Sequence, residues 1–204
     1  MDEENKTGLD GNYIPQRAKR DPAREKRQVI FKEILSWVKV VVAAVVISLF
    51  INNVVIVNAT VPSGSMMNTI PARSRLIALR PAYLFTEPQR FDVVVFRFPD
   101  DESAMHVKRI IGMPGEQVEI VDGRVFINGS HEPLDDSFIF EPPIVRAFEQ
   151  NRVFNVPENS FFVLGDHRND SLDSRSWVTT SYLPRENILG RAIFVYFPRI
   201  SLIR

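Results

Sequence analysis

The hydrophobic residues are concentrated in one long stretch near the N-terminus. No charged residue occurs between Val40 and Ala72, and residues 34–57 are apolar apart from two serines, one lysine and two asparagines. As a helix, these 24 positions would reach about 36 Å, more than the ~30 Å hydrocarbon core of a bilayer. The pattern predicts a transmembrane helix over 34–57. A buried core helix is the alternative, although core helices seldom run this far without polar positions.

The charged residues that flank this stretch predict its orientation. Seven Lys or Arg residues lie within residues 17–32, whereas the next basic residue after the stretch is Arg73. The positive-inside rule therefore places residues 1–33 in the cytoplasm as a polar and basic tail, and residues 58–204 outside. We expect a single-pass protein of the plasma membrane. A cleaved signal peptide is the rival interpretation, since Val57-Asn58-Ala59 would suit cleavage, but its charged leading region would be unusually long.

Short apolar runs bounded by turn residues follow the long stretch and favour β-strands. The runs lie at residues 93–98, 118–121, 124–127, 161–164 and 192–197. Asp122-Gly123 predicts a type I′ hairpin turn, because both of its turn residues need a positive φ. Asn128-Gly129 predicts a second turn. Residues 134–158, rich in Phe, Pro and acidic side chains, are predicted to form an irregular excursion, and no long helical period appears beyond residue 60. Residues 58–204 are therefore predicted to be a mainly β domain.

The composition excludes several classes of function. The 25 basic and 25 acidic residues balance, which argues against a general nucleic-acid binder. With no cysteine, the chain has no disulfide, thiolate metal site or cysteine nucleophile, and its three scattered histidines do not favour a metal site. We expect no metal, no cofactor and no nucleic-acid partner.

The first segment that suggests chemistry is Pro62-Ser63-Gly64-Ser65. It follows the apolar stretch 54–61 directly, and its proline and glycine predict a tight bend that exposes a serine oxygen and aligns backbone N–H groups. Most such bends are simple turns. A serine hydroxyl is a weak nucleophile that needs an adjacent base, and no Gly-x-Ser-x-Gly elbow is present.

The second segment is a predicted strand that carries Lys108. Strand alternation places Lys108 on one face with His106 and Ile110, and Arg109 on the other face. On an inner face Lys108 would become a usable base, because lowering its pKa from ~10.4 toward neutrality takes about 4 kcal/mol, which burial can supply. The alternative is a surface charge beside Arg109. Periodicity alone does not decide which face is inside.

The third segment, residues 165–176, is dense in Asp, Asn, Ser and Arg. It suits a polar network that holds a loop, in which Asp173 and Arg175 are close enough to pair. A solvated loop is the alternative. A calcium loop built on Asp166, Asp170 and Asp173 lacks the required Glu and spacing.

These segments, in this order behind a single anchor, resemble type I signal peptidases, most closely the compact one-anchor form of Gram-positive bacteria. Val61-Pro62-Ser63-Gly64-Ser65-Met66 resembles the nucleophile box of that family, and Arg90-Phe91-Asp92-Val93-Val94-Val95-Phe96 resembles its apolar strand. Lys108-Arg109-Ile110-Ile111-Gly112-Met113-Pro114-Gly115 is similar to the lysine box, and residues 165–175 to the last box. The resemblance implies a mainly β domain of antiparallel coiled sheets preceded by one transmembrane helix.

The same resemblance implies roles for individual residues. Ser65 would be the nucleophile and Lys108 the general base of a Ser-Lys dyad, with the Ser65 N–H and the Ser63 hydroxyl holding the oxyanion. Ser171 would orient the lysine amine, and Asp173 would form a structural ion pair with Arg175.

The implied substrate is an exported preprotein whose signal peptide ends in Ala-x-Ala. It would emerge from the secretion translocon and bind as an extended strand between the segment before the nucleophile and the lysine strand. The residues expected to bind it are Ala59, Val61, Pro62, His106 and Val107. The lipid bilayer is the other expected partner, and Met66 and Met67 would either enter the outer leaflet or pack in the core.

The chain departs from the family pattern at several positions. Asn68 replaces a proline, Phe91 and Val178 each replace a glycine, and Asn169-Asp170 inverts the commoner order of these two residues. These departures concern loop geometry and substrate preference.

Two rival functions remain. Self-cleaving repressors of the DNA-damage response share the dyad, but they carry a DNA-binding domain where this chain has its apolar stretch. A catalytically inactive homologue could act as an assembly factor, for instance in pilus building, and loss of Ser65 or Lys108 would mark it. Self-cleavage after Ala59 also remains open.

Overall fold

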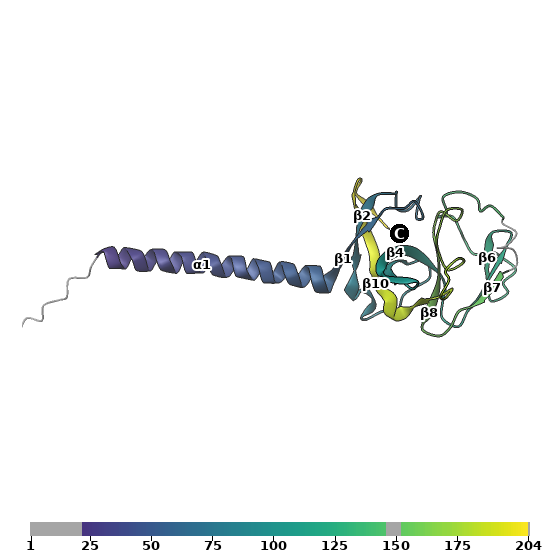
Figure 1. Cartoon of the computed structure of the whole chain (residues 1–204), viewed down its shortest axis with the longest axis horizontal. Coiled ribbons are helices and arrows are strands. Elements are labelled where there is room, and N and C mark those ends of the chain that lie inside the picture. Colours follow the sequence, from purple (N-terminus) through teal and green to yellow (C-terminus); the bar gives the residue numbers. More distant parts are fainter. Residues whose placement is uncertain (1–21, 146–151, 204) are drawn as a thin grey trace, which may run out of the picture. The chain divides into compact units, whose positions relative to one another are not determined.

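The computed structural model describes residues 22–145 and 152–203, and the chain divides into two compact units between Val46 and Ile47. The first element is the long helix α1 (Pro22–Phe50), which continues as a single π-helical turn, η1 (Ile51–Val55) (Figure 1). The segment Ile30–Val55 is long and apolar enough to cross a membrane, and none of its most apolar window is buried. Exposure on all sides disfavours the buried core helix. The strand β1 begins at Ile56, so the helix ends two residues before the predicted boundary.

The main sheet of the β domain is antiparallel and runs in the order β1-β2-β10-β3-β4-β8-β9, with β11 paired to β10. Its strands are β1 (Ile56–Val61), β2 (Ser74–Leu79), β3 (Val93–Phe98), β4 (Asp101–Gly112), β8 (Ser160–Leu164), β9 (Leu183–Pro184), β10 (Ile188–Phe197) and β11 (Ser201–Leu202). Two 3-10 turns, η2 (Arg80–Tyr83) and η4 (Arg185–Asn187), connect parts of this sheet. The runs predicted at 93–98, 161–164 and 192–197 are all confirmed as strands.

A second sheet of three strands runs in the order β6-β5-β7, and Figure 1 shows β8 between it and β10. Its strands are β5 (Gln117–Val121), β6 (Arg124–Ile127) and β7 (Arg152–Asn155). The predicted hairpin is confirmed, with φ of 48° at Asp122 and 76° at Gly123. Asn128 and Gly129 also have positive φ, as the second predicted turn requires.

The prediction of an irregular segment over 134–158 is wrong in one part. β7 lies inside it and pairs with β5, with Val118 opposite Phe154. Only Phe154 is fully buried within this four-residue strand, so its apolar pattern is too short to distinguish it from a loop. Its stability comes from a partner that is distant along the chain.

Three hydrophobic cores hold the domain together, and the strand that carries Lys108 contacts all of them. Val107 lies in the core beneath β1 and β2, Ile110 in the core around Trp177, and Ile111 in the core shared with the small sheet. Both faces of β4 are therefore buried over residues 107–112. This double burial removes the question of which face is inside, because Lys108 and Arg109 are both interior.

Candidate active site

Ser65 lies in a compact turn that follows directly on β1. The Met67 N–H donates to the Gly64 carbonyl at 2.9 Å, and the Ile70 N–H donates to the Met66 carbonyl at 2.7 Å. Met66 and Ile70 are completely buried in the core beneath β1 and β2, which fixes the turn on the domain. Of the two roles expected for Met66, the structure shows core packing.

Lys108 lies in the middle of β4 and reaches the turn that carries Ser65, here called the nucleophile turn (residues 63–70). Its Nζ donates a hydrogen bond of 2.7 Å to Ser65 Oγ. Both side chains are almost completely buried, with 4% of Lys108 and 5% of Ser65 exposed. Ser63 Oγ donates in turn to Ser65 Oγ at 3.3 Å. The three polar side chains expected to work together are thus in contact.

Burial changes the acidity of Lys108. Removal from water penalises its charged form and lowers its pKa from 10.5 to about 8, although the carboxylates of Asp173 and Asp166 partly offset this effect. Burial also lowers the pKa of His106, whose ring stacks on Phe98 with the centroids 4.3 Å apart. The amine of Lys108 is therefore the basic group that touches the serine.

A cleft of about 460 Å³ opens beside Ser65 and Lys108. Its lining includes four of the five residues expected to bind substrate: Val61, Pro62, His106 and Val107. Ala59 does not line the cleft; its side chain is 2% exposed and belongs to the core, so a role in binding would fall to its backbone at the edge of β1. Thr60, the next residue of β1, also lines the cleft. The bond after Ala59 lies within β1, where Ala59 pairs with Leu76.

The polar segment 165–176 packs closely against the nucleophile turn. The His167 N–H donates to the Ser65 carbonyl at 3.0 Å. A Cβ on Gly165 would lie 2.5 Å from that same carbonyl and 2.2 Å from Ser171 Oγ, so only glycine permits this approach. Ser171 Oγ is buried, and its hydroxyl is one of the groups that lower the pKa of Asp173. The structure therefore places Ser171 beside the turn but shows no bond from it to Lys108.

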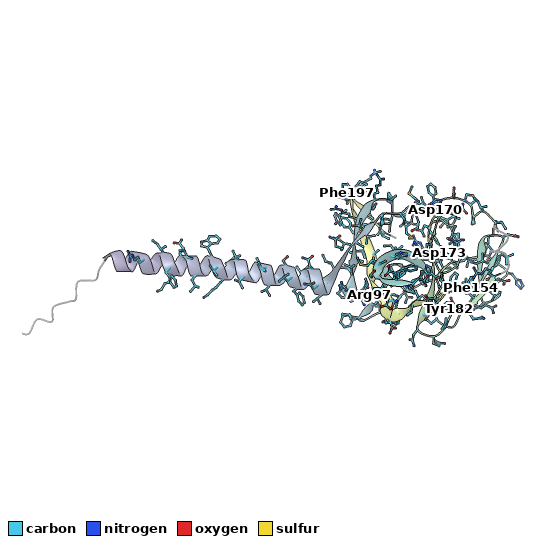
Figure 2. All side chains as sticks on the ribbon, viewed as in Figure 1. Arg97, Phe154, Asp170, Asp173, Tyr182 and Phe197 are labelled. Atoms are coloured by element: carbon cyan, nitrogen blue, oxygen red, sulfur yellow. The ribbon has the colours of Figure 1, made fainter. Side chains whose placement is uncertain are left out.

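Asp173 and Arg175 form the expected pair. The Arg175 Nε and Nη2 donate to the two carboxylate oxygens of Asp173 at 2.8 and 2.9 Å. The Gly165 N–H also donates to Asp173. Burial raises the pKa of Asp173, but Arg175 outweighs this effect and the net pKa is lowered. Asp173, which is labelled with Asp170 in Figure 2, is therefore a buried anion that acts on Lys108 from inside the loop.

A second buried ion pair was not identified from the sequence. Arg109 donates through Nε and Nη2 to the two carboxylate oxygens of Asp166 at 2.9 and 2.7 Å, and both side chains are at most 2% exposed. Thr69, from the nucleophile turn, donates its hydroxyl to the same carboxylate. The pair thus joins the lysine strand, the nucleophile turn and segment 165–176. It also leaves Asp166 and Asp173 both paired with arginines, which is incompatible with the calcium loop considered from the sequence.

Residues 134–145, here called the clasp segment, cover this ion pair. The Phe138 ring lies over the Arg109 guanidinium, with 4.4 Å from Cζ to the ring centroid. Two of the departures from the family pattern meet here. Asn68 donates to the Phe138 carbonyl at 2.9 Å, and the Phe91 ring lies 5.4 Å from the Phe138 ring. Both residues have positive φ, 85° at Asn68 and 73° at Phe91, which explains why glycine suits the position of Phe91. Val178, the third such departure, is 91% exposed.

The clasp segment also holds segment 165–176 from its outer side. Asp136 accepts two hydrogen bonds from Arg168, at 2.7 and 3.1 Å. Glu141 contacts His167 Nε2 at 3.0 Å and accepts from Asn169 Nδ2 at 2.7 Å. The region predicted as irregular is therefore tied to the candidate site by ion pairs and hydrogen bonds.

The described residues contain no group of three or more His, Asp or Glu side chains arranged to hold a metal ion. Within this part of the chain, the site consists of a buried serine, a buried lysine and the polar network behind them. This arrangement is suited to nucleophilic attack by serine with an amine as the base.

The comparisons with known proteins agree with this chemistry. Residues 34–197 match the family described as "Signal peptidase, peptidase S26". Signal peptidase I of Leptolyngbya laminosa is 38% identical over 81% of this chain and 80% of its own length. The probable signal peptidase I-2 of Synechocystis is 39% identical over 81% and 75%. Signal peptidase I S of Bacillus subtilis is 32% identical over 82% and 91%, so the two cyanobacterial proteins are more similar to this chain than the Bacillus one.

Both the match to the family and the identity to these relatives extend over most of the chain. The fold is mainly antiparallel β with one N-terminal apolar helix, as expected. The chain belongs to the type I signal peptidases of the serine peptidase family S26.

Proposed function

We propose that this chain is a membrane-bound serine endopeptidase that removes signal peptides from exported preproteins by cutting after Ala-x-Ala-like sites with a Ser-Lys dyad. The hydrogen bond of 2.7 Å from Lys108 Nζ to Ser65 Oγ carries the proposal. It supports a dyad because it joins a potential nucleophile to a base whose pKa burial has lowered to about 8. No described feature favours the inactive assembly factor, since both dyad residues are present and in contact.

In the proposed mechanism, neutral Lys108 removes the hydroxyl proton as Ser65 Oγ attacks the carbonyl carbon of the second alanine. The Ser65 N–H and the Ser63 hydroxyl donate to the oxyanion, and loss of one such donor typically costs ~10²–10³ in rate. Protonated Lys108 then donates its proton to the leaving amine as the peptide bond breaks. Lys108 next deprotonates a water molecule, which hydrolyses the acyl-enzyme and restores Ser65.

Two free strand edges support binding of the substrate as an extended peptide. Among the described strands β1 ends the main sheet, so its edge away from β2 is unpaired. β4 pairs with β8 only from Arg109 onward, which leaves its earlier residues unpaired on that side. Residues 60–63 and 104–108 from these two edges line the cleft. A substrate strand placed between them would gain backbone hydrogen bonds from both sides.

The proposed location is the plasma membrane, with residues 1–33 in the cytoplasm and the catalytic domain outside. The apolar length of Ile30–Val55 and the seven basic residues within 17–32 support this orientation. An anchored enzyme would meet preproteins as they leave the secretion translocon, and the lipid bilayer would be its second partner.

The full chain in detergent, incubated with a preprotein that carries an Ala-x-Ala site, tests the proposal. Mass spectrometry should locate one cut after the second alanine. Ser65→Ala and Lys108→Met should abolish it, and Lys108→Arg should fail as well, because arginine does not deprotonate. Ser130→Ala, at an exposed turn serine, is the matched control and should cleave normally. Cleavage by folded Ser65→Ala would overturn the proposal.

A further inference from the structure

The cleft contains few charged side chains. Among its lining residues only Lys108, His106 and Asp170 are titratable. Lys108 is hydrogen-bonded to Ser65, and burial lowers the pKa of His106, which favours its neutral ring. Asp170 is therefore the one acidic side chain among these lining residues.

The carboxylate of Asp170 differs from its neighbours in having no partner. Asp166 is paired with Arg109, and Asp173 with Arg175. The remaining arginine of the segment, Arg168, is paired with Asp136 of the clasp segment. Within residues 22–145 and 152–203, no hydrogen bond or ion pair reaches the side chain of Asp170, which is exposed. Its negative charge is available to whatever occupies the cleft.

The order of Asn169 and Asp170, inverted relative to the family pattern, explains why a carboxylate lines the cleft. Asn169 uses both ends of its amide, donating to Glu141 at 2.7 Å and accepting from the Ile144 N–H at 2.7 Å. An aspartate at position 169 could not donate to Glu141 and would repel it. The order Asn169-Asp170 therefore satisfies the clasp segment and places the carboxylate in the cleft.

We propose that Asp170 is a specificity-determining residue that selects preproteins with a lysine or arginine close to the cleavage site. This inference rests on the proposed function, because it assumes that a peptide occupies the cleft. The cleft is shared by Asp170 and the dyad, and an extended strand rises about 3.3 Å per residue. Because side chains alternate along an extended strand, the favoured basic side chain belongs near the cut, on the alternate positions that face Asp170.

Asp170 also acts on Lys108. The charged groups that influence the Lys108 amine are Asp173, Asp166 and Asp170, which raise its pKa, and Arg175, which lowers it; His106 lies on the same strand face, and burial favours its neutral ring. Neutralising Asp170 removes one of the raising effects. The activity of Asp170→Asn on an uncharged peptide should therefore rise at a lower pH than that of the wild type.

The experiment uses the full chain in detergent and a set of peptides with one Ala-x-Ala site. A single lysine is placed at each position within about four residues of the cut, and matched peptides carry glutamate or glutamine there. Values of kcat/KM are compared for the wild type, Asp170→Asn and Asp170→Glu. Glu186→Gln, at an exposed carboxylate outside the cleft, is the matched control.

The wild type should cleave the best lysine peptide about fivefold faster than its glutamine match, as expected for one charge pair in a partly exposed site. Asp170→Asn should lose this preference, Asp170→Glu and Glu186→Gln should keep it, and added salt should weaken it. An unchanged preference in Asp170→Asn, or none in the wild type, overturns the inference. Failure to cleave even the uncharged peptide would instead defeat the proposed function.

Discussion

The lowered pKa of Lys108 leads to a quantitative prediction for the pH dependence of cleavage. Shifting this pKa from 10.5 to about 8 means that the site disfavours the ammonium by about 3 kcal/mol, at about 1.4 kcal/mol per pKa unit. At pH 7 about one-tenth of the lysine would be neutral, compared with about 0.03% at the unshifted pKa of 10.5. Burial thus increases the fraction of competent base about 300-fold.

The sign follows from the role of the neutral amine. Because Lys108 must be deprotonated to accept the Ser65 proton, kcat/KM should rise with pH and level off above the pKa of the free enzyme. The assay measures kcat/KM from pH 6 to 10 on a peptide without titratable groups in that range. Enzyme held at each pH and then assayed at one fixed pH serves as the control for unfolding.

A single ionisation with a midpoint near pH 8 is the expected result. A midpoint above 10 would show that Lys108 is not desolvated in the working enzyme. A midpoint near 6 would assign the base to a histidine, and either result would refute the reasoning from burial.

Three further predictions concern the scaffold of the site. Gly165→Ala should reduce cleavage by ~10² or more, because its Cβ would lie 2.5 Å from the Ser65 carbonyl; the same peptide assay measures this loss. Arg109→Met should lower the free energy of unfolding by about 3–5 kcal/mol, since it leaves the buried Asp166 charge unpaired, and urea denaturation of the full chain in detergent would show it. A cost below 1 kcal/mol would contradict the structural role of this pair. The free energy of unfolding of Phe91→Gly, measured by urea denaturation, should exceed that of Phe91→Ala by about 1 kcal/mol, because only glycine adopts the φ of 73° without strain. Equal stabilities would count against strain at this position.

Local patterns in the sequence were enough to predict several elements. The apolar stretch indicates α1 because a membrane-spanning helix needs only a sufficiently long run of predominantly apolar residues, which is visible in the sequence. The hairpin of β5 and β6 follows from Asp122-Gly123, whose positive φ values are a property of those two residues. The strands at β3, β8 and β10 follow from continuous apolar runs, and the side chains of β3 and of β8 are each divided between two of the three cores.

Elements that depend on distant partners were not predicted. β7 has one buried residue of its own and exists because β5 provides an edge. The Arg109–Asp166 pair joins two residues 57 positions apart, and nothing local marks either as buried. The face alternation of β4 was equally uninformative, since the two sides of Lys108 are covered by different cores.

The candidate dyad came from the resemblance to a family and not from periodicity. One signal in the sequence could have drawn attention to the lysine without it. Lys108 is the single lysine after Lys39, although arginines are plentiful in the same region. Arginine serves every surface and ion-pair role there, so a lone lysine suggests a function that needs an amine able to deprotonate.

The role of Ser65 as the nucleophile is the central claim, and trapping the acyl-enzyme tests it most directly. The full chain is mixed with an Ala-x-Ala substrate, quenched in acid during turnover, digested and mapped by mass spectrometry. The account predicts that the signal-peptide fragment is attached to Ser65 as an ester, and that Lys108→Met forms no such adduct. An adduct on another residue, or steady cleavage by an enzyme that never carries the fragment, would contradict it.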